Sequence, residues 1–284
     1  RIGPSAIAGL SLAGNAMFLI FALTQVLNVG TATLISHAVG KKENNEANLT
    51  FNQAMMISCI AGIVVCVVGY LGADTYLNIV SQDAATFEVG LDYLYWFIPC
   101  MALQFLMVAI SAALRGTGIV KPTMMVQMAS IVVNIVLSPI RLEGWFTGYP
   151  MGIASAGLAS SISVVFTVLL LRHYFLSMTK YLTFDLSLWK FISKNIKKNL
   201  TIGLPASGEF FLIFIYMGSI YWLIQRFGPE AHAAFGLGQR IMQSLFLPAM
   251  AIAFAAPAVA GQNFGAEKYQ RVRDTFTWSA ILTG

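Results

Sequence analysis

Glu209 is the residue whose type and position most strongly suggest chemistry. It lies in an apolar run from Ile202 to Ile224, shortly after Pro205, and of the 12 acidic residues it alone lies inside such a run. A charged side chain at the centre of a membrane helix costs roughly 2.5–3.5 kcal/mol, so such groups usually face a cavity and bind an ion or a substrate. Helical periodicity places Leu212 and Tyr216 on the same face. Alternatively, Glu209 supports the helix beside Pro205 or lies near the membrane surface.

The composition indicates an all-α integral membrane protein. Of the 284 residues, 57% are hydrophobic and only 10% are charged, and the mean hydropathy is +0.73. So few charges do not cover the surface of a water-soluble domain. The net charge of +5 does not indicate a nucleic-acid partner, because Lys and Arg lie between apolar runs and not among aromatic residues on one face. The three cysteines lie inside apolar runs without a ligand-spaced partner, which argues against a metal site.

Seven apolar runs are candidates for membrane-spanning helices, which need about 20 residues each. They are Ile7–Ala38, Phe51–Leu71, Tyr93–Leu114, Met124–Pro139, Ile153–Phe175, Ile202–Ile224 and Ala231–Ala260. An eighth run begins near Thr275. The lipid bilayer is therefore the partner that covers most of the predicted surface.

The distribution of Lys and Arg predicts the orientation. Thirteen of the 17 lie in one set of alternate loops, three lie in the other set, and Arg240 lies inside an apolar run. Cytoplasmic loops are enriched in Lys and Arg, so the segment from His173 to Asn199 is expected to be a cytoplasmic linker and Arg1 to lie outside. If the N-terminus of the protein is cytoplasmic, we expect the chain to be an internal piece that lacks an odd number of helices, most simply one, before Arg1.

A faint internal repeat predicts two similar halves. A shift of 225 residues aligns seven identical pairs: Ala8 with Ala233, Leu12 with Leu237, Met17 with Met242, Phe21 with Phe246, Gly40 with Gly265, Thr50 with Thr275 and Phe51 with Phe276. Parallel repeats of this kind occur in transporters whose halves are related by an axis along the membrane normal. We therefore expect a partial two-lobe transporter of parallel six-helix repeats. Residues 1–198 would form the N-terminal lobe with its linker, and residues 199–284 the start of the C-terminal lobe, without most of helices nine to twelve.

Four stretches carry a family resemblance. They are Gly30–Gly40, Ala113–Pro122 with the sequence Ala-Leu-Arg-Gly-Thr-Gly-Ile-Val-Lys-Pro, Gly203-Leu-Pro205 and Gly261-Gln-Asn-Phe-Gly-Ala266. Physically, Gly116 and Gly118 would allow a positive-φ turn at the membrane surface. Together the stretches resemble the multidrug and toxic compound extrusion (MATE) family along the whole chain.

The resemblance implies two lobes around a central cavity and export of organic cations or other amphipathic drugs, driven by inward Na⁺ or H⁺. On that basis we expect a monomeric multi-pass protein of the cell inner (plasma) membrane that works by alternating access. The coupling ion would be Na⁺ or H⁺. No enzymatic activity, no other cofactor and no nucleic-acid partner are expected.

The resemblance also implies a cation site in the N-terminal lobe. Asn134 matches the family's asparagine, Ser160 is a candidate for its hydroxyl ligand, and Ser138 stands where many members have aspartate. Asn134 and Ser138 lie one turn apart, on one helix face. The loss of the carboxylate weakens the case for Na⁺, because a hard cation prefers charged oxygen ligands. Alternatively, Asn134 only joins two helices through a hydrogen bond.

Two other functions remain as alternatives. A lipid-linked saccharide flippase of the same superfamily would need several Arg or Lys residues in the cavity, and Arg240 is the one candidate inside an apolar run. A membrane-embedded enzyme would need an intramembrane cluster of His, Asp or Cys, which the sequence does not suggest.

Overall fold

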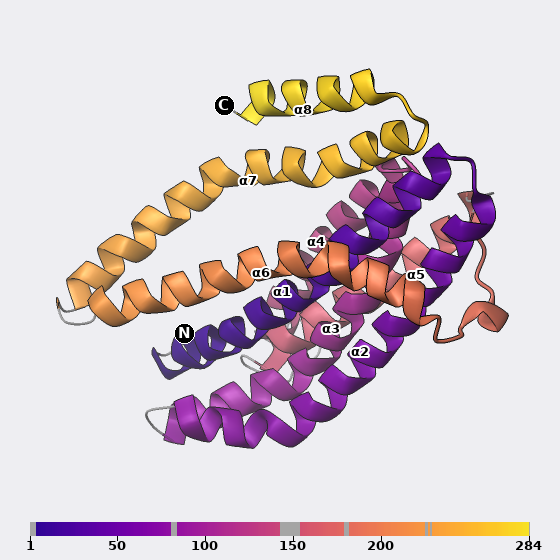
Figure 1. Cartoon of the computed structure of the whole chain (residues 1–284). Helices are drawn as coiled ribbons and strands as arrows, with labels where there is room; N and C mark the ends of the chain where they lie inside the picture. Colours follow the sequence, from indigo (N-terminus) through magenta and orange to yellow (C-terminus); the bar gives the residue numbers. More distant parts are fainter. Residues whose placement is uncertain are drawn as a thin grey trace.

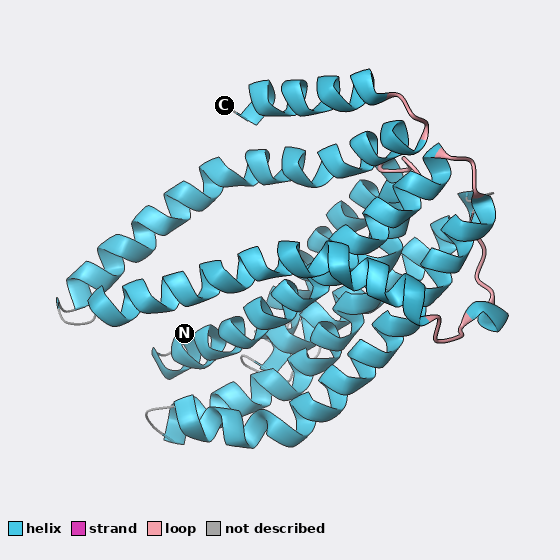
Figure 2. Ribbon diagram, viewed as in Figure 1, coloured by secondary structure: helices cyan, strands magenta, loops and turns pink. Residues whose placement is uncertain are grey.

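The computed structural model describes residues 4–80, 84–142, 154–178, 182–224, 227 and 229–283, and its regular structure there is entirely helical (Figure 2). The elements are α1 (Pro4–Gly40), α2 (Asn44–Val80), α3 (Ala84–Gly116), α4 (Lys121–Leu142), α5 (Ala154–Met178), the 3₁₀ turn η1 (Leu186–Leu188), α6 (Ser193–Ile224), α7 (Pro229–Gly265) and α8 (Tyr269–Thr283). The predicted all-α fold is confirmed.

Seven of the described helices are long and apolar enough to cross a membrane. Their spanning parts are Ala16–Gly40, Asn44–Ile79, Thr86–Gly116, Lys121–Ser138, Ala154–Ser177, Ser193–Met217 and Ile241–Gly265. Each corresponds to one predicted run, and most extend beyond it. The largest correction concerns the linker. The segment from His173 to Asn199 is partly helical, because α5 continues to Met178 and α6 begins at Ser193. The predicted lobe boundary at residues 198 and 199 lies within α6 and stays a prediction.

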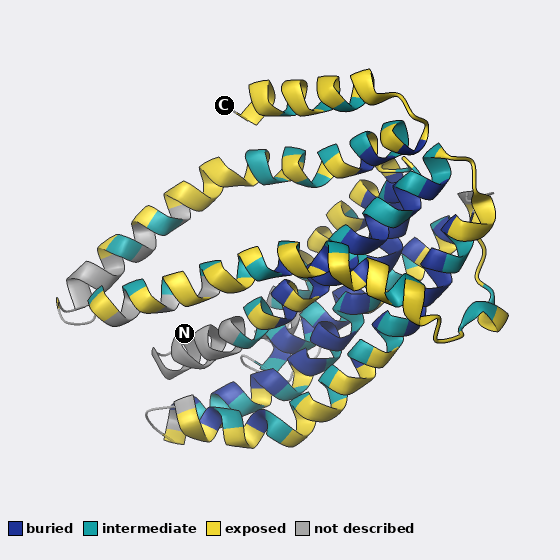
Figure 3. Ribbon diagram, in the orientation of Figure 1, coloured by how far each residue is buried: buried dark blue, intermediate teal, exposed yellow. Residues whose placement is uncertain are grey.

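The core lies where α1, α2, α3 and α5 pack together, and α3 contacts each of the other three (Figures 1 and 3). Phe97, Ile98, Met101 and Phe105 of α3 are buried in the first of two apolar clusters. The second cluster contains Ile35, Phe51, Leu114, Leu171 and Leu182. α4 packs on the outside of α5, while α6 and α7 pack against α1, which is thus the helix that joins the two parts of the molecule.

One end of the molecule, here called the basic end, is formed by the α1–α2 turn, the α3–α4 turn, the α5–α6 linker and the α7–α8 turn. Two contacts join these segments in pairs: Lys198 Nζ lies 3.6 Å from Glu46 Oε1, and Gln262 Nε2 donates to the Gly116 carbonyl oxygen at 2.8 Å. The Lys and Arg side chains that the structure describes lie at or near this end, namely Lys41, Lys42, Arg115, Lys121, Arg172, Lys190, Lys194, Lys197, Lys198, Lys268, Arg271 and Arg273. That the basic end is cytoplasmic remains a prediction.

The internal repeat is confirmed by the helix bounds and by the turns that follow. α1 and α7 each have 37 residues, and both their first and last residues differ by 225. Lys42 and Glu267, also 225 apart, are the described non-glycine residues with positive φ, at 62° and 59°. The same turn hydrogen bonds recur, for example Lys42 N to Val39 O and Glu267 N to Phe264 O, both at 3.0 Å. α7 is visibly curved (Figure 1) and contains Pro248 and Pro257, which remove backbone hydrogen bonds.

Candidate functional site

The structure brings the predicted residues Asn134, Ser138 and Ser160 together between α4 and α5. Asn134 Nδ2 donates to Ser160 Oγ at 3.3 Å, and Ser138 Oγ donates to Asn134 Oδ1 at 3.4 Å. Ser160 Oγ also donates to the Ala156 carbonyl oxygen at 2.9 Å. All three residues are half-buried. Their polar atoms thus form a small neutral network whose two inter-residue hydrogen bonds are long and weak.

This network lacks the charged oxygen that a hard cation prefers. Among the residues that the structure describes, no group of three or more His, Cys, Asp or Glu side chains is placed to hold a metal ion. The neutral oxygens suit a polar contact within the helix bundle better than they suit a sodium ion.

Glu209 and Tyr216 lie on an uncovered face of α6. Glu209 is exposed, and so are Leu212 and Tyr216 on the same helical face, with 67% and 59% of their surfaces exposed. Within the described part of the chain, Glu209 has neither a hydrogen bond nor an ion pair. The structure does not bring Glu209 close to the Asn134 network, because α6 packs on α1 whereas α4 packs on α5.

The opposite face of α6 is joined tightly to α1. Ser207 Oγ donates to the Ala22 carbonyl oxygen at 2.8 Å, and Asn199 Nδ2 donates to Thr31 Oγ1 at 3.1 Å, both in buried surroundings. Between them, a Cβ atom on Gly203 would overlap the Val26 carbonyl oxygen. The glycine of the Gly203-Leu-Pro205 stretch therefore allows the two backbones to approach closely.

The end of α7 crosses the end of α1 in a pseudo-symmetric contact. A Cβ atom on Gly40 would overlap the carbonyl oxygen of Gln262, and one on Gly265 would overlap that of His37. His37 and Gln262 are themselves 225 residues apart, so each repeat makes the same contact with the other. A Cβ on Gly261 would overlap Ser36 Oγ, and these two residues are also repeat partners. The local two-fold axis therefore passes close to Ser36 and Gly261.

The α3–α4 turn completes this contact. Gly118 has φ of 85°, as expected for a positive-φ turn, and the Gln262 amide lies against it and donates to the carbonyl oxygen of Gly116. The expectation of positive φ at Gly116 is wrong, because Gly116 is the last residue of α3. Its small size matters instead, since a Cβ there would lie 2.9 Å from Ile35 Cβ. Contacts among α1, α3 and α7 thus close the molecule at the basic end.

An aromatic cluster that the sequence did not single out lies next to Glu209 in the chain. Phe210 packs edge-on against Phe21 of α1, with ring centroids 5.4 Å apart, and parallel to Phe254 of α7 at 6.5 Å. These three side chains connect α1, α6 and α7. With 20 phenylalanines in the chain, no pattern in the sequence marks these three.

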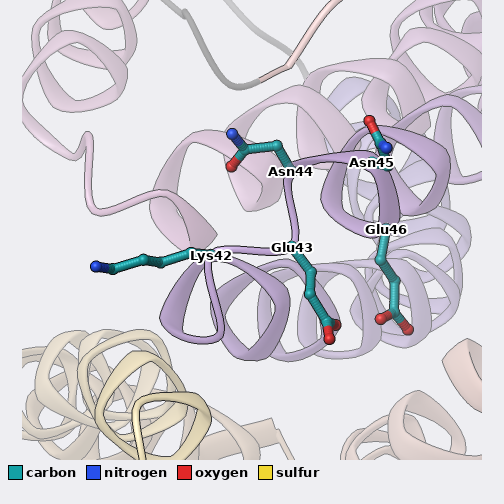
Figure 4. Close-up of a pocket in the computed structure, with 5 residues that line it drawn as sticks. All are labelled: Lys42, Glu43, Asn44, Asn45 and Glu46. Atoms are coloured by element: carbon teal, nitrogen blue, oxygen red, sulfur yellow. The ribbon is translucent and has the colours of Figure 1, made fainter.

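A surface depression lies on the α1–α2 turn and is lined by residues 42–46 (Figure 4). The Glu43 and Glu46 carboxylates point the same way, whereas Lys42 points away from them. All five residues are exposed. The depression is an open feature of the turn, and it has neither the apolar walls nor the burial of a substrate site.

Comparisons with known proteins identify the architecture. The MatE family model matches residues 1–140 and 205–284. The probable multidrug resistance protein YoeA of Bacillus subtilis (strain 168) is 26% identical over 96% of this chain and 59% of its own length. An FAD transporter of Shewanella oneidensis is 21% identical over 98% of this chain and 62% of its own length. The chain thus spans about three fifths of these relatives.

A solved outward-facing structure of a multidrug resistance MATE family transporter of the MOP superfamily superposes with a TM-score of 0.88. It is 21% identical and covers 98% of this chain and 61% of its own. The likeness of fold extends over the N-terminal bundle and over α6 and α7. Together with the family match over most of the sequence, it leads to one conclusion: the chain belongs to the MatE family, the multidrug and toxic compound extrusion family of membrane transporters.

Proposed function

We propose that the protein is a cation-coupled antiporter that exports organic cations or other amphipathic drugs by alternating access. In this proposal Glu209 is the group for which the coupling cation, Na⁺ or H⁺, competes with a cationic substrate. The protein would act as a monomer in the cell inner membrane, with the bilayer and small drugs as its partners, and with neither a nucleic-acid partner nor a cofactor apart from the coupling ion.

The observation that carries the proposal is the position of the Glu209 carboxylate within the spanning part of α6, Ser193–Met217. A charge at this depth is costly unless it faces water, a ligand or a partner, so a carboxylate at this position favours a binding role. Tyr216 on the same face offers a ring that suits a cationic ligand. A carboxylate that binds either a cation or a cationic drug, but not both, links the movements of the two.

The Asn134 network has a secondary role in this proposal. Without a carboxylate at position 138, Asn134, Ser138 and Ser160 supply neutral oxygens that would contact the substrate or a weakly held cation. The coupling charge therefore resides on Glu209. This division of roles between Glu209 and the Asn134 network is supported by the long hydrogen bonds within the network and by the absence of a carboxylate from it.

The closed basic end supports alternating access. In this structure α1, α3 and α7 are joined at that end, whereas the face of α6 that carries Glu209 is uncovered. Transport would require the contacts at Gly40, Gly261 and Gly265 to separate, so that Glu209 becomes accessible from the basic end.

The test is export of a fluorescent organic cation from proteoliposomes driven by a proton or sodium gradient. Glu209→Gln keeps the shape and hydrogen-bonding capacity of the side chain but removes the charge, so it should abolish most ion-driven export. Glu88→Gln is the matched control, because Glu88 is an exposed carboxylate of α3 outside the proposed site. Equal export by wild type and Glu209→Gln, with the same ion dependence, would refute the proposal.

The flippase alternative predicts a different site. A pyrophosphate-linked substrate needs several cationic side chains along the pathway, but the described Lys and Arg side chains gather at the basic end. The side chain of Arg240, the one candidate from the sequence, lies outside the described residues. Export of a fluorescent cation without movement of a lipid-linked saccharide in the same vesicles would separate the two functions.

A further inference from the structure

The linker between α5 and α6 has large apolar side chains on its surface. Leu186 is 71% exposed and Phe191 is 73% exposed, and Phe184 is also exposed. In Figures 1 and 3 the linker around η1 lies at the margin of the bundle, beyond the packed helices. Apolar side chains that project from a short segment of this kind are suited to the boundary between headgroups and acyl chains.

Three lysines lie beside these apolar residues without an acidic partner. Lys190, Lys194 and Lys197 are exposed, and none forms an ion pair within the described part of the chain. The nearby acids Glu46 and Asp185 do not pair with these lysines. Glu46 pairs with Lys198 at 3.6 Å, and Asp185 accepts a hydrogen bond from Ser187 N at 2.9 Å. Hydrogen bonds from the hydroxyl and the backbone N–H of Ser187 hold the pKa of Asp185 below its ordinary value.

The start of α6 strengthens this excess of positive charge. Its first turn contains no acidic residue, although the N-terminal end of a helix already carries a partial positive charge. Lysines at that position are unfavourable unless an anion lies nearby, and free backbone N–H groups there can bind phosphate. Acidic groups of the described chain do not balance this positive charge. The segment is therefore expected to attract an anionic partner.

The linker is held in a fixed position on α2. Asn48 Oδ1 accepts from Thr183 N at 2.8 Å, Asn52 Oδ1 accepts from Asp185 N at 2.9 Å, and Asn52 Nδ2 donates to Thr183 O at 2.9 Å. Leu182 is buried in the adjacent apolar cluster. Because the linker joins a span that ends at Ser177 to one that begins at Ser193, these contacts hold it at the membrane surface.

We propose that residues 184–197 form a binding surface for anionic phospholipid headgroups. Leu186 and Phe191 insert at the level of the upper acyl chains, while Lys190, Lys194 and Lys197 contact lipid phosphates. The combination of exposed apolar side chains, unpaired lysines and a fixed position between two spans distinguishes a lipid surface from a solvated loop. This surface is separate from Glu209 and does not depend on the transport proposal.

Spin-label accessibility tests the position of the apolar side chains. Leu186→Cys and Phe191→Cys, each in a cysteine-free full chain reconstituted with phosphatidylcholine and phosphatidylglycerol, should carry labels that oxygen reaches and a water-soluble nickel complex does not. Asn45→Cys is the control, because Asn45 is exposed in the depression of the α1–α2 turn and should favour the nickel complex. Nickel accessibility at residues 186 and 191 equal to that at residue 45 would overturn the proposal and favour a soluble protein partner.

Lipid selectivity tests the lysines. The preference of the reconstituted protein for spin-labelled phosphatidylglycerol over phosphatidylcholine should fall by roughly fivefold or more when Lys190, Lys194 and Lys197 are changed to Gln. Changing the same lysines to Arg should keep the preference. A second triple variant, with Lys42, Lys268 and Arg271 changed to Gln, loses the same amount of charge elsewhere at the basic end. This variant should keep most of the preference for phosphatidylglycerol. Equal losses in the two Gln variants would show that the linker is not a specific surface.

Discussion

The two faces of α6 differ in their surroundings. One face packs against α1, and the other carries the residues proposed to bind the cation and the substrate. The face with Asn199, Gly203 and Ser207 is buried against α1 through hydrogen bonds and close backbone contact. The face with Glu209 and Tyr216 is uncovered and carries the charge. Closure therefore depends on small residues and backbone atoms, whereas binding, in the function proposed above, depends on a carboxylate and an aromatic ring. Substitutions on the buried face should change how firmly the basic end closes, whereas substitutions of Glu209 should change how closure responds to cations.

The contact between α1 and α7 at the basic end should be the most sensitive to added volume. Gly265→Val places side-chain atoms where the His37 carbonyl oxygen lies, so it should prevent closure. Overpacking of this kind costs typically about 1–3 kcal/mol. We expect export to fall roughly tenfold, since about 1.4 kcal/mol corresponds to a tenfold change in an equilibrium constant.

Gly72→Val and Gly238→Val are the controls, because no described atom lies within 4 Å of a Cβ at either position. Transport by these variants should remain near the wild-type rate at equal incorporation. If Gly265→Val also transports normally, the crossing of α1 and α7 does not control closure.

A smaller effect is expected at Gln262, which donates a hydrogen bond from α7 to the Gly116 carbonyl oxygen at 2.8 Å. Gln262→Leu removes a bond worth about 0.5–1.5 kcal/mol and should open the basic end severalfold more often. Thiol labelling of Ser36→Cys, in a cysteine-free background, measures the opening, because Ser36 is fully buried at the crossing of α1 and α7 in the closed state. Asn263→Leu changes an amide that donates to Val259 of its own helix, and it should leave labelling unchanged.

Much of the fold follows from the sequence because the bilayer constrains it so strongly. Apolar runs of sufficient length predicted the seven spans, and seven identical pairs of residues 225 apart, Gly40 and Gly265 among them, predicted the repeat. The linker was predicted too long, because amphipathic residues such as Lys194 and Lys197 begin α6 before its apolar part. Periodicity and hydropathy do not detect helical turns that contain such charged residues.

Residues of the candidate site could be predicted only where the residue type is energetically costly in an apolar run or matches the family resemblance. Glu209 stands out because a carboxylate in an apolar run is expensive, and Asn134 stands out through the family resemblance. Phe21, Phe210 and Phe254 were not found, since their meeting depends on how three helices cross. The overlap of the repeat partners Ser36 and Gly261 could have been anticipated, because residues near a two-fold axis must face their own equivalents.

The smallest effect is expected at Ser138, and Ser161 of α5 provides the comparison. Ser138→Ala removes a weak hydrogen bond of 3.4 Å and should change thermal stability in lipid by less than about 0.5 kcal/mol. Ser161→Ala removes a buried hydroxyl that donates to Trp96 O at 2.5 Å and accepts from Cys100 N at 3.2 Å. That change should cost about 1–3 kcal/mol, because a buried donor loses its partner. Equal destabilisation by both would mean that the Asn134 network is structural.

The central claim is that the charge of Glu209 controls whether the basic end is closed. Lys41 and Ala266 are exposed repeat partners on the two sides of the α1–α7 crossing, so spin labels at both positions report its separation. Double electron–electron resonance in proteoliposomes should show one narrow, short distance when the end is closed and a longer one when it opens. In the wild-type background, the balance of the two should shift with proton or sodium concentration. In Glu209→Gln the distribution should be the same under all these conditions, and a shift equal to that of the wild type would contradict the account.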